Sequence, residues 1–210
     1  MNKRTSFDEA FLKRKLTSIS LQRQVMFAVS CASRLFPTYA TVAILTGHGN
    51  PTILQSALEY AWALSAGAPL ESAVCEDHQS LVMHLIDKDH DDSGRLLPSC
   101  AEDAASAVAF ALRTCLHDDP AQEAMWAARR VYECIDMFVG ESRKIDTSRP
   151  GAEIDILSDP LIQTELSRQW RDIEELISSP ILDQRSLARH FRERSLKEVA
   201  LPLDSDATYD

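Results

Sequence analysis

The chain has 210 residues, of which 45% are apolar and 26% charged, with only six glycines and nine prolines. These proportions are ordinary for a soluble globular protein, and so few turn-forming residues disfavour a many-stranded sandwich or barrel. The formal net charge of −10 argues against nucleic-acid binding, which depends on clustered Lys and Arg. It favours association with a basic protein partner.

Cysteine spacing and the N-terminal sequence indicate the compartment. The five cysteines lie far apart, form no C-x-x-C motif and are odd in number, so neither a disulfide framework nor a zinc site is expected. Residues 1–15 lack the apolar run of a signal peptide, and no stretch resembles a membrane span of about 20 apolar residues. We therefore expect a cytoplasmic protein with no membrane partner.

Apolar residues recur at helical spacing along most of the chain, beginning with a short N-terminal helix. The clearest early pattern covers residues 21–36, and Pro37 is expected to end that helix. A further helix then extends to the turn at residues 47–50. Asn50 and Pro51 are the expected cap and first residue of the helix that follows.

Another helix is expected over residues 70–86. Its apolar residues Leu70, Val74, Leu81 and Leu85 are spaced so that they share one face. We therefore predict that this stripe faces the core. An acidic loop separates this helix from the next.

Residues 98–140 are the predicted centre of the fold, as an antiparallel pair of helices. Ser99 and Glu102 stand three apart, the spacing of a capping box, and predict the start of the first helix. Both helices carry stripes of small apolar residues, which let helix axes approach closely. The stripes are Ala104, Val108, Ala111, Leu112 and Cys115 on the first helix, and Ala124, Ala128, Val131, Ile135 and Phe138 on the second.

The last quarter of the chain begins with a polar stretch, residues 141–158, that is predicted to be an irregular connection. Pro160 and Pro180 are expected to open the two closing helices. The last helix is rich in arginine, and we expect its basic residues to pair with Asp172, Glu174 and Glu175 on the helix before it.

The sequence thus predicts an all-α fold, a bundle of seven or eight helices around the central antiparallel pair. One helical domain is expected over residues 1–201, followed by an acidic flexible tail over residues 202–210.

Four segments of the chain have the order and composition of a known family. They are LQRQVMFAVSCASRLFPTYA (21–40), PSCAEDAASAVAFAL (98–112), DPLIQTELSRQWRDIEEL (159–176) and ARHFRERS (188–195). These segments resemble the YjaG-like family of uncharacterised bacterial proteins, domain of unknown function 416. The resemblance implies an all-helical fold. Because the family has no established activity, it implies no catalytic residue.

The acidic loop carries Asp87, Asp89, Asp91 and Asp92, a group of carboxylates suited to contact with a basic partner. The loop also matches the first half of an EF-hand calcium loop. However, Cys100 stands where the bidentate glutamate of an EF-hand belongs, so a solvated linker is favoured over a calcium site.

A second group of carboxylates falls on the central pair, with Glu102 and Asp103 on the first helix and Glu133 and Asp136 on the second. Paired E-x-x-E and E-x-x-D motifs on neighbouring helices hold magnesium in helical nucleotide pyrophosphatases. The first of these motifs is absent here, and the helix dipole alone also explains acids at a helix N-terminus. A magnesium-dependent nucleotide hydrolase is therefore the alternative function.

No arrangement for nucleophilic catalysis is recognisable, since the sequence has neither a G-x-S-x-G elbow nor a Gly-rich phosphate loop. The favoured function is a non-enzymatic, partner-binding protein that needs no cofactor. One version of it is an immunity- or antitoxin-like inhibitor of a basic protein. A structural homo-oligomer is a further alternative.

Overall fold

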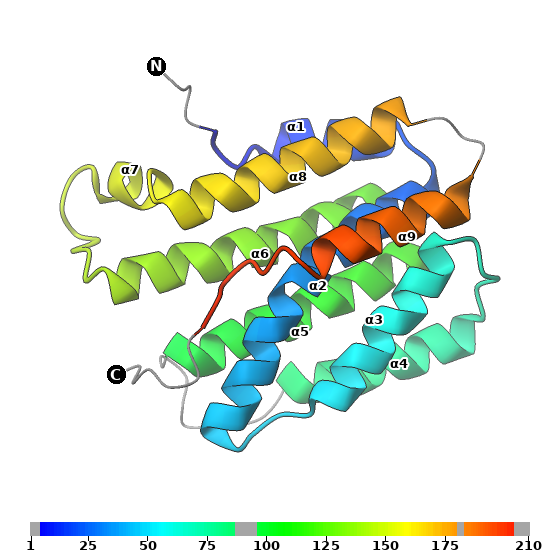
Figure 1. Ribbon diagram of the computed structural model, residues 1–210, viewed down its shortest axis with the longest axis horizontal. Helices are drawn as coiled ribbons and strands as arrows, with labels where there is room; N and C mark the ends of the chain where they lie inside the picture. Colours follow the sequence, from blue (N-terminus) through cyan, green and yellow to red (C-terminus); the bar gives the residue numbers. More distant parts are fainter. Residues whose placement is uncertain (1–4, 87–95, 180–182, 204–210) are drawn as a thin grey trace.

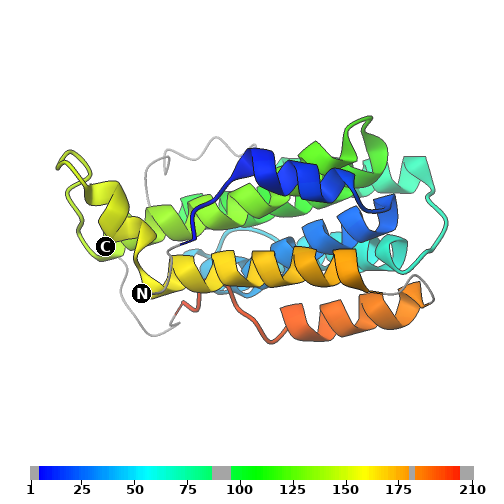
Figure 2. The same cartoon turned by 90° about the horizontal axis from the view of Figure 1, so that it is seen from above.

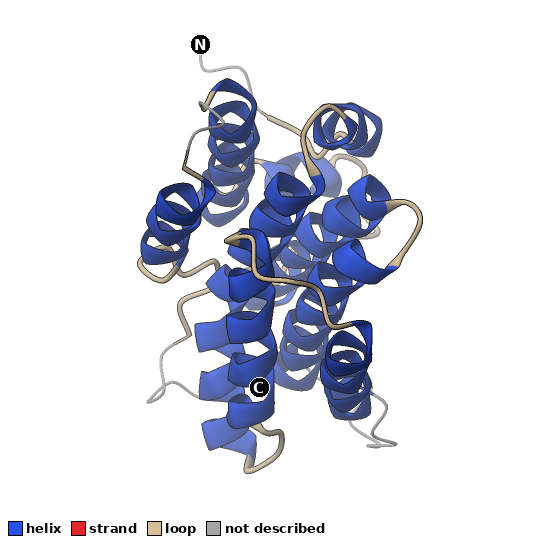
Figure 3. Cartoon of the chain, turned by 90° about the vertical axis from the view of Figure 1, so that its right-hand side faces the viewer, coloured by secondary structure: helices blue, strands red, loops and turns tan. Residues whose placement is uncertain are grey.

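The chain folds as an all-α bundle, as the sequence predicts. The computed structural model describes residues 5–86, 96–179 and 183–203, which form nine helices and no strand (Figures 1 and 3). The helices are α1 (Glu9–Thr17), α2 (Leu21–Thr46), α3 (Pro51–Ser65), α4 (Ser72–Ile86), α5 (Leu96–Leu116), α6 (Pro120–Ser142), α7 (Ala152–Leu157), α8 (Pro160–Ser178) and α9 (Gln184–Ser195). Most of the predicted tail, residues 204–210, lies outside this description.

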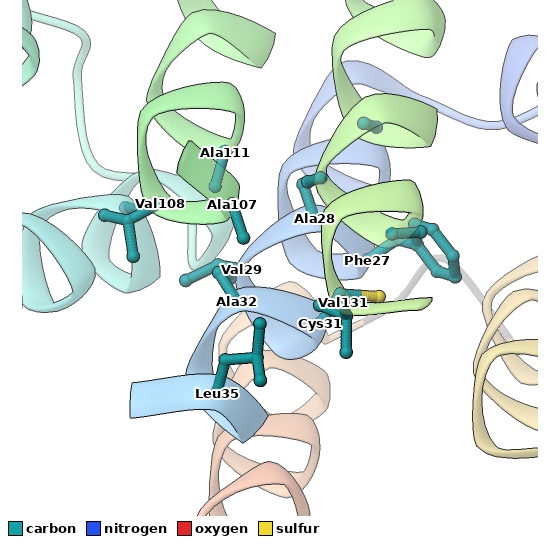
Figure 4. Close-up of a cluster of buried hydrophobic side chains, with 14 of the residues drawn as sticks. Phe27, Ala28, Val29, Cys31, Ala32, Leu35, Ala107, Val108, Ala111 and Val131 are labelled. Carbon is teal, nitrogen blue, oxygen red and sulfur yellow. The ribbon is translucent and has the colours of Figure 1, made fainter. Parts of the chain in front are cut away.

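Helix α2 is the central element. Residues 23–35 are all buried, so this helix is surrounded on every side. It contacts α3, α5, α6, α8 and α9. Figure 4 shows side chains of α2, among them Ala28 and Val29, meeting Ala107 and Ala111 of α5 and Val131 of α6.

The predicted central pair is present as α5 and α6, which pack against each other as well as against α2. The predicted stripes are buried, except that Cys115 and Phe138 are half-buried. The prediction that a capping box begins the first of these helices was wrong, because α5 already includes Pro98 and Ser99. Proline is tolerated in a first helical turn, because the N–H groups of that turn have no acceptor within the helix.

Helix α2 continues through Pro37, so the prediction that this residue ends the helix was wrong. A proline inside a helix removes one N–H donor and displaces carbonyls of the preceding turn. The C-terminal segment bonds to this part of α2. The Ala200 N–H donates to the Arg34 carbonyl at 2.9 Å, and the Thr38 hydroxyl donates to the Leu201 carbonyl at 2.8 Å.

Two other boundaries differ from the predicted ones. Helix α7 lies within residues 141–158, which were expected to be irregular throughout. Helix α9 begins after Asp183 rather than at Pro180, because the Asp183 carboxylate accepts the Ser186 N–H at 3.0 Å and caps the helix. The caps predicted from Asn50-Pro51 are confirmed, since the Asn50 side chain accepts the N–H groups of the first turn of α3.

By length and composition, α2 is also the one described helix that could cross a membrane. No segment of this kind was expected from the sequence. However, 61% of its most apolar window is buried inside the bundle, as expected for the core helix of a soluble protein. This feature is weak evidence for a membrane span.

One guanidinium is completely buried beside this core. Arg34 of α2 is 0% exposed, and it faces Glu165 and Asp172 of α8, whose side chains are each 1% exposed. The Arg34 Nη2 atom lies 2.7 Å from Glu165 Oε1, and Nη1 lies 2.8 Å from Asp172 Oδ2. Burial disfavours the charged guanidinium, but the two carboxylates outweigh burial and raise the pKa of Arg34.

Further hydrogen bonds complete this ionic network and tie α8 to α9, which run side by side along one face (Figures 1 and 2). Asp172 Oδ1 accepts from Arg194 of α9 at 3.0 Å and from Arg171 at 2.9 Å. Arg194 also pairs with Glu175 at 2.5 Å. The predicted pairing between the last helix and the acids of the preceding one is therefore confirmed for Asp172, which is buried, and for Glu175, whereas no described ion pair includes Glu174.

The buried network gives a first test. We expect Arg34→Met to lower the free energy of unfolding by about 3 to 5 kcal/mol, because it leaves two carboxylates buried without a counter-charge. Arg149→Met is the matched control: Arg149 pairs with Asp155 on the surface, so its loss should cost less than about 0.5 kcal/mol. Urea denaturation measures both. A loss below about 1 kcal/mol for Arg34→Met would contradict the assigned role of the network.

Candidate functional site

The four aspartates predicted to contact a partner, Asp87, Asp89, Asp91 and Asp92, lie outside the described residues. The same holds for most of the EF-hand-like loop. Both interpretations stay predictions.

The second predicted carboxylate group lies in an arginine-rich environment. Arg130 of α6 donates to Asp103 of α5 at 3.2 Å and also pairs with Glu133. Asp136, one turn further along α6, accepts the Tyr132 hydroxyl at 3.3 Å. A guanidinium thus supplies the positive charge beside two of the four predicted magnesium ligands.

Burial changes the titration of two of these groups. It raises the pKa of Asp103 from 3.8 to about 6, although the charge of Arg130 acts in the opposite direction. Burial also raises the pKa of Asp136, against the effect of the Tyr132 hydrogen bond.

The fourth member, Glu102, is exposed. Within the described ranges, no three His, Cys, Asp or Glu side chains are grouped so that they could hold a metal ion. The magnesium-dependent hydrolase stays a prediction, which comparison of nucleotide hydrolysis by the wild type and Asp136→Ala would decide.

Helix α4 presents an apolar stripe to solvent. Leu70, Val74 and Leu81 were predicted to face the core, but they are 42%, 37% and 49% exposed, so this prediction was wrong. The buried residues of α4 are instead Cys75 and Val82.

The position of α4 explains this orientation. The helix lies at the edge of the bundle, opposite α8 (Figure 1), and packs on α3 and α5 alone among the main helix contacts. Val74, Leu81 and the half-buried Leu85 share one side of the helix because they are seven and four residues apart. We call Leu70, Val74, Leu81 and Leu85 the α4 stripe.

Acidic residues lie next to the α4 stripe, in a part of the chain that contains no Lys or Arg. Glu71, Glu76 and Asp77 are exposed next to it. Residues 35–86, which include all of α3 and α4, contain four carboxylates and no Lys or Arg. This face therefore combines apolar side chains with acidic neighbours, a composition that suits a basic amphipathic partner.

A pocket lies at the Leu85 end of the α4 stripe. It encloses about 70 Å³ where the C-terminal ends of α2 and α4 meet the first turns of α5. Its walls are mostly apolar and include Ala43, Leu85 and Pro98. The Glu102 carboxylate lines the same pocket and forms no ion pair with the described residues. We call this the end pocket.

Tyr39 lines the end pocket and shapes the turn beside it. Its hydroxyl accepts the Asn50 N–H at 3.0 Å, and burial raises its pKa. The turn approaches closely because position 49 is glycine, with φ of +97°. A Cβ at Gly49 would lie 2.9 Å from the Tyr39 hydroxyl oxygen, so a side chain there would displace one of the two.

The spacing in the sequence identifies the α4 stripe but predicts that it lies in the core, and Glu102 was predicted only as a capping residue and a metal ligand. The exposure of the stripe could not be predicted, since periodicity identifies an apolar face without showing what covers it. The absence of Lys and Arg over residues 35–86 is a signal in the sequence that marks this side of the molecule.

The titration of Asp103 gives a second test. Between about pH 4 and pH 6 the folded chain keeps a proton on Asp103 that the unfolded chain has released, so the stability of the wild type falls as pH rises through this range. Asp103→Asn cannot titrate. From pH 4 to pH 7, we expect the free energy of unfolding of Asp103→Asn to rise, relative to that of the wild type, by on the order of 2 to 3 kcal/mol, measured by urea denaturation.

Arg130→Met is the companion variant. It removes the charge that lowers the pKa of Asp103, so the pH range over which the wild-type side chain titrates should move upward. A constant difference between Asp103→Asn and the wild type from pH 4 to pH 7 would show that Asp103 titrates normally.

Comparisons with known proteins agree on a family. The family model described as "Protein of unknown function (DUF416)" matches residues 11–197. The crystal structure of a DUF416 family protein from Shewanella baltica OS155 superposes with a TM-score of 0.76 at 15% sequence identity, covering 88% of this chain and 93% of that one. At this identity the likeness shows the fold alone.

No curated protein matches the sequence. The resemblance noted from four segments is nevertheless confirmed, because the family model covers most of the chain. This all-α chain belongs to the DUF416 family of proteins of unknown function.

Proposed function

We propose that this chain is a partner-binding protein whose α4 stripe docks a basic segment of another protein. The observation that carries the proposal is the exposure of Val74 and Leu81 on one side of α4, with the exposed Leu70 just before the helix, at the edge of the bundle. Single exposed apolar residues are common, but a row of them next to a pocket is typical of interaction sites.

Charge favours a basic partner over a second copy of the chain. Two copies meeting through α4 would bring Glu71, Glu76 and Asp77 near their counterparts, and like charges across an interface oppose association. An amphipathic helix with leucine-like residues on one face and Lys or Arg on its flanks would bury the stripe and pair with these acids.

An immunity- or antitoxin-like role is one form of this proposal, in which the basic partner is a toxin. A toxin gene adjacent to the gene for this chain would support that form. A neighbourhood of unrelated housekeeping genes would count against it.

The test is site-specific photo-crosslinking in the native host. We expect a crosslinking amino acid at position 81 to label one protein rich in Lys and Arg, and we expect Val74→Glu to abolish that adduct. The control position is 196, because Leu196 is 58% exposed at the end of α9, outside the stripe. It should give no such adduct.

Reconstitution with the identified protein makes the test quantitative. Val74→Glu should weaken binding about tenfold or more, since it puts a charge into an apolar contact. Leu196→Glu should leave the affinity unchanged, and circular dichroism checks that both variants fold. The proposal fails if positions 81 and 196 label the same proteins, if position 81 labels only a second copy, or if it labels nothing.

A further inference from the structure

We propose that the end pocket is a binding site for a primary alkylammonium group. In the complex, it would hold the side chain of a lysine of the partner. The assignment to the partner's lysine rests on the proposed function, whereas the affinity of the pocket for an alkylammonium ion does not.

The backbone around the end pocket favours a positive ligand. Helix α2 ends at Thr46, which lines the pocket. The last carbonyls of a helix lack intrahelical partners and act as about half a negative charge. The Gly47 N–H satisfies only one such carbonyl of α2, that of Ala43, at 3.0 Å.

The opposing contribution is smaller. Pro98 and Ala101, near the N-terminal end of α5, also line the pocket, and that end acts as about half a positive charge, which offsets the C-terminal end of α2. Glu102, in the second turn of α5, adds a full negative charge at the pocket wall. Summed over the described residues that line the pocket, the charge is therefore negative, and a carboxylate or phosphate ligand is disfavoured.

The volume of the end pocket and the residues that line it favour a ligand with a slender, apolar stem. The volume of about 70 Å³ corresponds to about five water-sized spheres, comparable to a chain of four or five methylene groups. Ala43, Leu85 and Pro98 provide apolar contacts for such a stem. Lysine has this shape, with an apolar stem and a compact charge at its end.

The test uses n-pentylammonium as the probe, with n-pentanol as the uncharged control and n-pentanoate as the anionic control. Binding is followed at pH 8 by methyl NMR shifts of Ala43, Leu85 and Ile86. We expect the ammonium ion to bind more tightly than the alcohol, and the alcohol more tightly than the carboxylate.

Two variants locate the site and its charge. Glu102→Gln should weaken pentylammonium binding about fivefold, the effect of one partly exposed ion pair, and should leave pentanol binding unchanged. Ala43→Leu should abolish binding of both by filling the pocket. An unchanged ammonium affinity in either variant, equal binding of ammonium and alcohol, or preference for the carboxylate would overturn the assignment.

The outcomes separate this inference from the proposed function. If pentylammonium binds as expected while position 81 captures no basic protein, the pocket is an alkylammonium site and the docking role of α4 fails. If position 81 captures a basic protein but pentylammonium does not bind, the docking role stands and the pocket assignment fails.

Discussion

The structure depends on a charge that has no access to water. Arg34 lies in the most buried part of α2, and its guanidinium can stay there only because Glu165 and Asp172 face it. Removing ions from water is costly, so every member of such a network must be held in place. The network thereby fixes α8 against α2, and Arg194 extends it to α9.

The same network explains the role of the two buried carboxylates of α8. Glu165 and Asp172 are paired with arginines and buried, so they act as structural ions. The C-terminal segment closes over this region, where the Ala200 N–H reaches the Arg34 carbonyl. On this side of the bundle, the polar chemistry serves to hold helices together.

The opposite side is built differently. Helix α4 is held by few buried side chains, among them Cys75, whose thiol lies 3.8 Å from the Leu112 carbonyl. Residues 35–86 contain four carboxylates and no Lys or Arg, and among the described residues α4 takes part in no ionic network comparable to that of Arg34. The fold therefore leaves an apolar stripe, an acidic margin and a pocket together at its edge.

Much of the fold could be predicted from the sequence, because a helix buries the stripe that its apolar spacing defines. The stripes of α5 and α6 are confirmed in this way. Spacing could not show that α2 continues past Pro37, where the distant segment at residues 200–201 bonds to the helix. Nor could it show that the stripe of α4 stays uncovered, because helical spacing identifies an apolar face without showing which neighbours cover it.

The buried network was missed for a related reason. Arg34 is the one charged residue in α2 after Arg23, and a lone charge inside a long uncharged helix indicates a buried counter-charge. Glu165, Gln169 and Asp172 are spaced at i, i+4 and i+7 on α8, so they share the face that meets it. The sequence contains both signals, but only the tertiary fold brings them together.

The central claim is that α4 and the end pocket form the face through which this chain acts. Hydrogen–deuterium exchange of the full chain, alone and in complex with its partner, tests it most directly. The account predicts slower exchange in α4 and in the turn at residues 47–50 on complex formation, with α8 and α9 unchanged. Protection confined to α8 and α9 would contradict it.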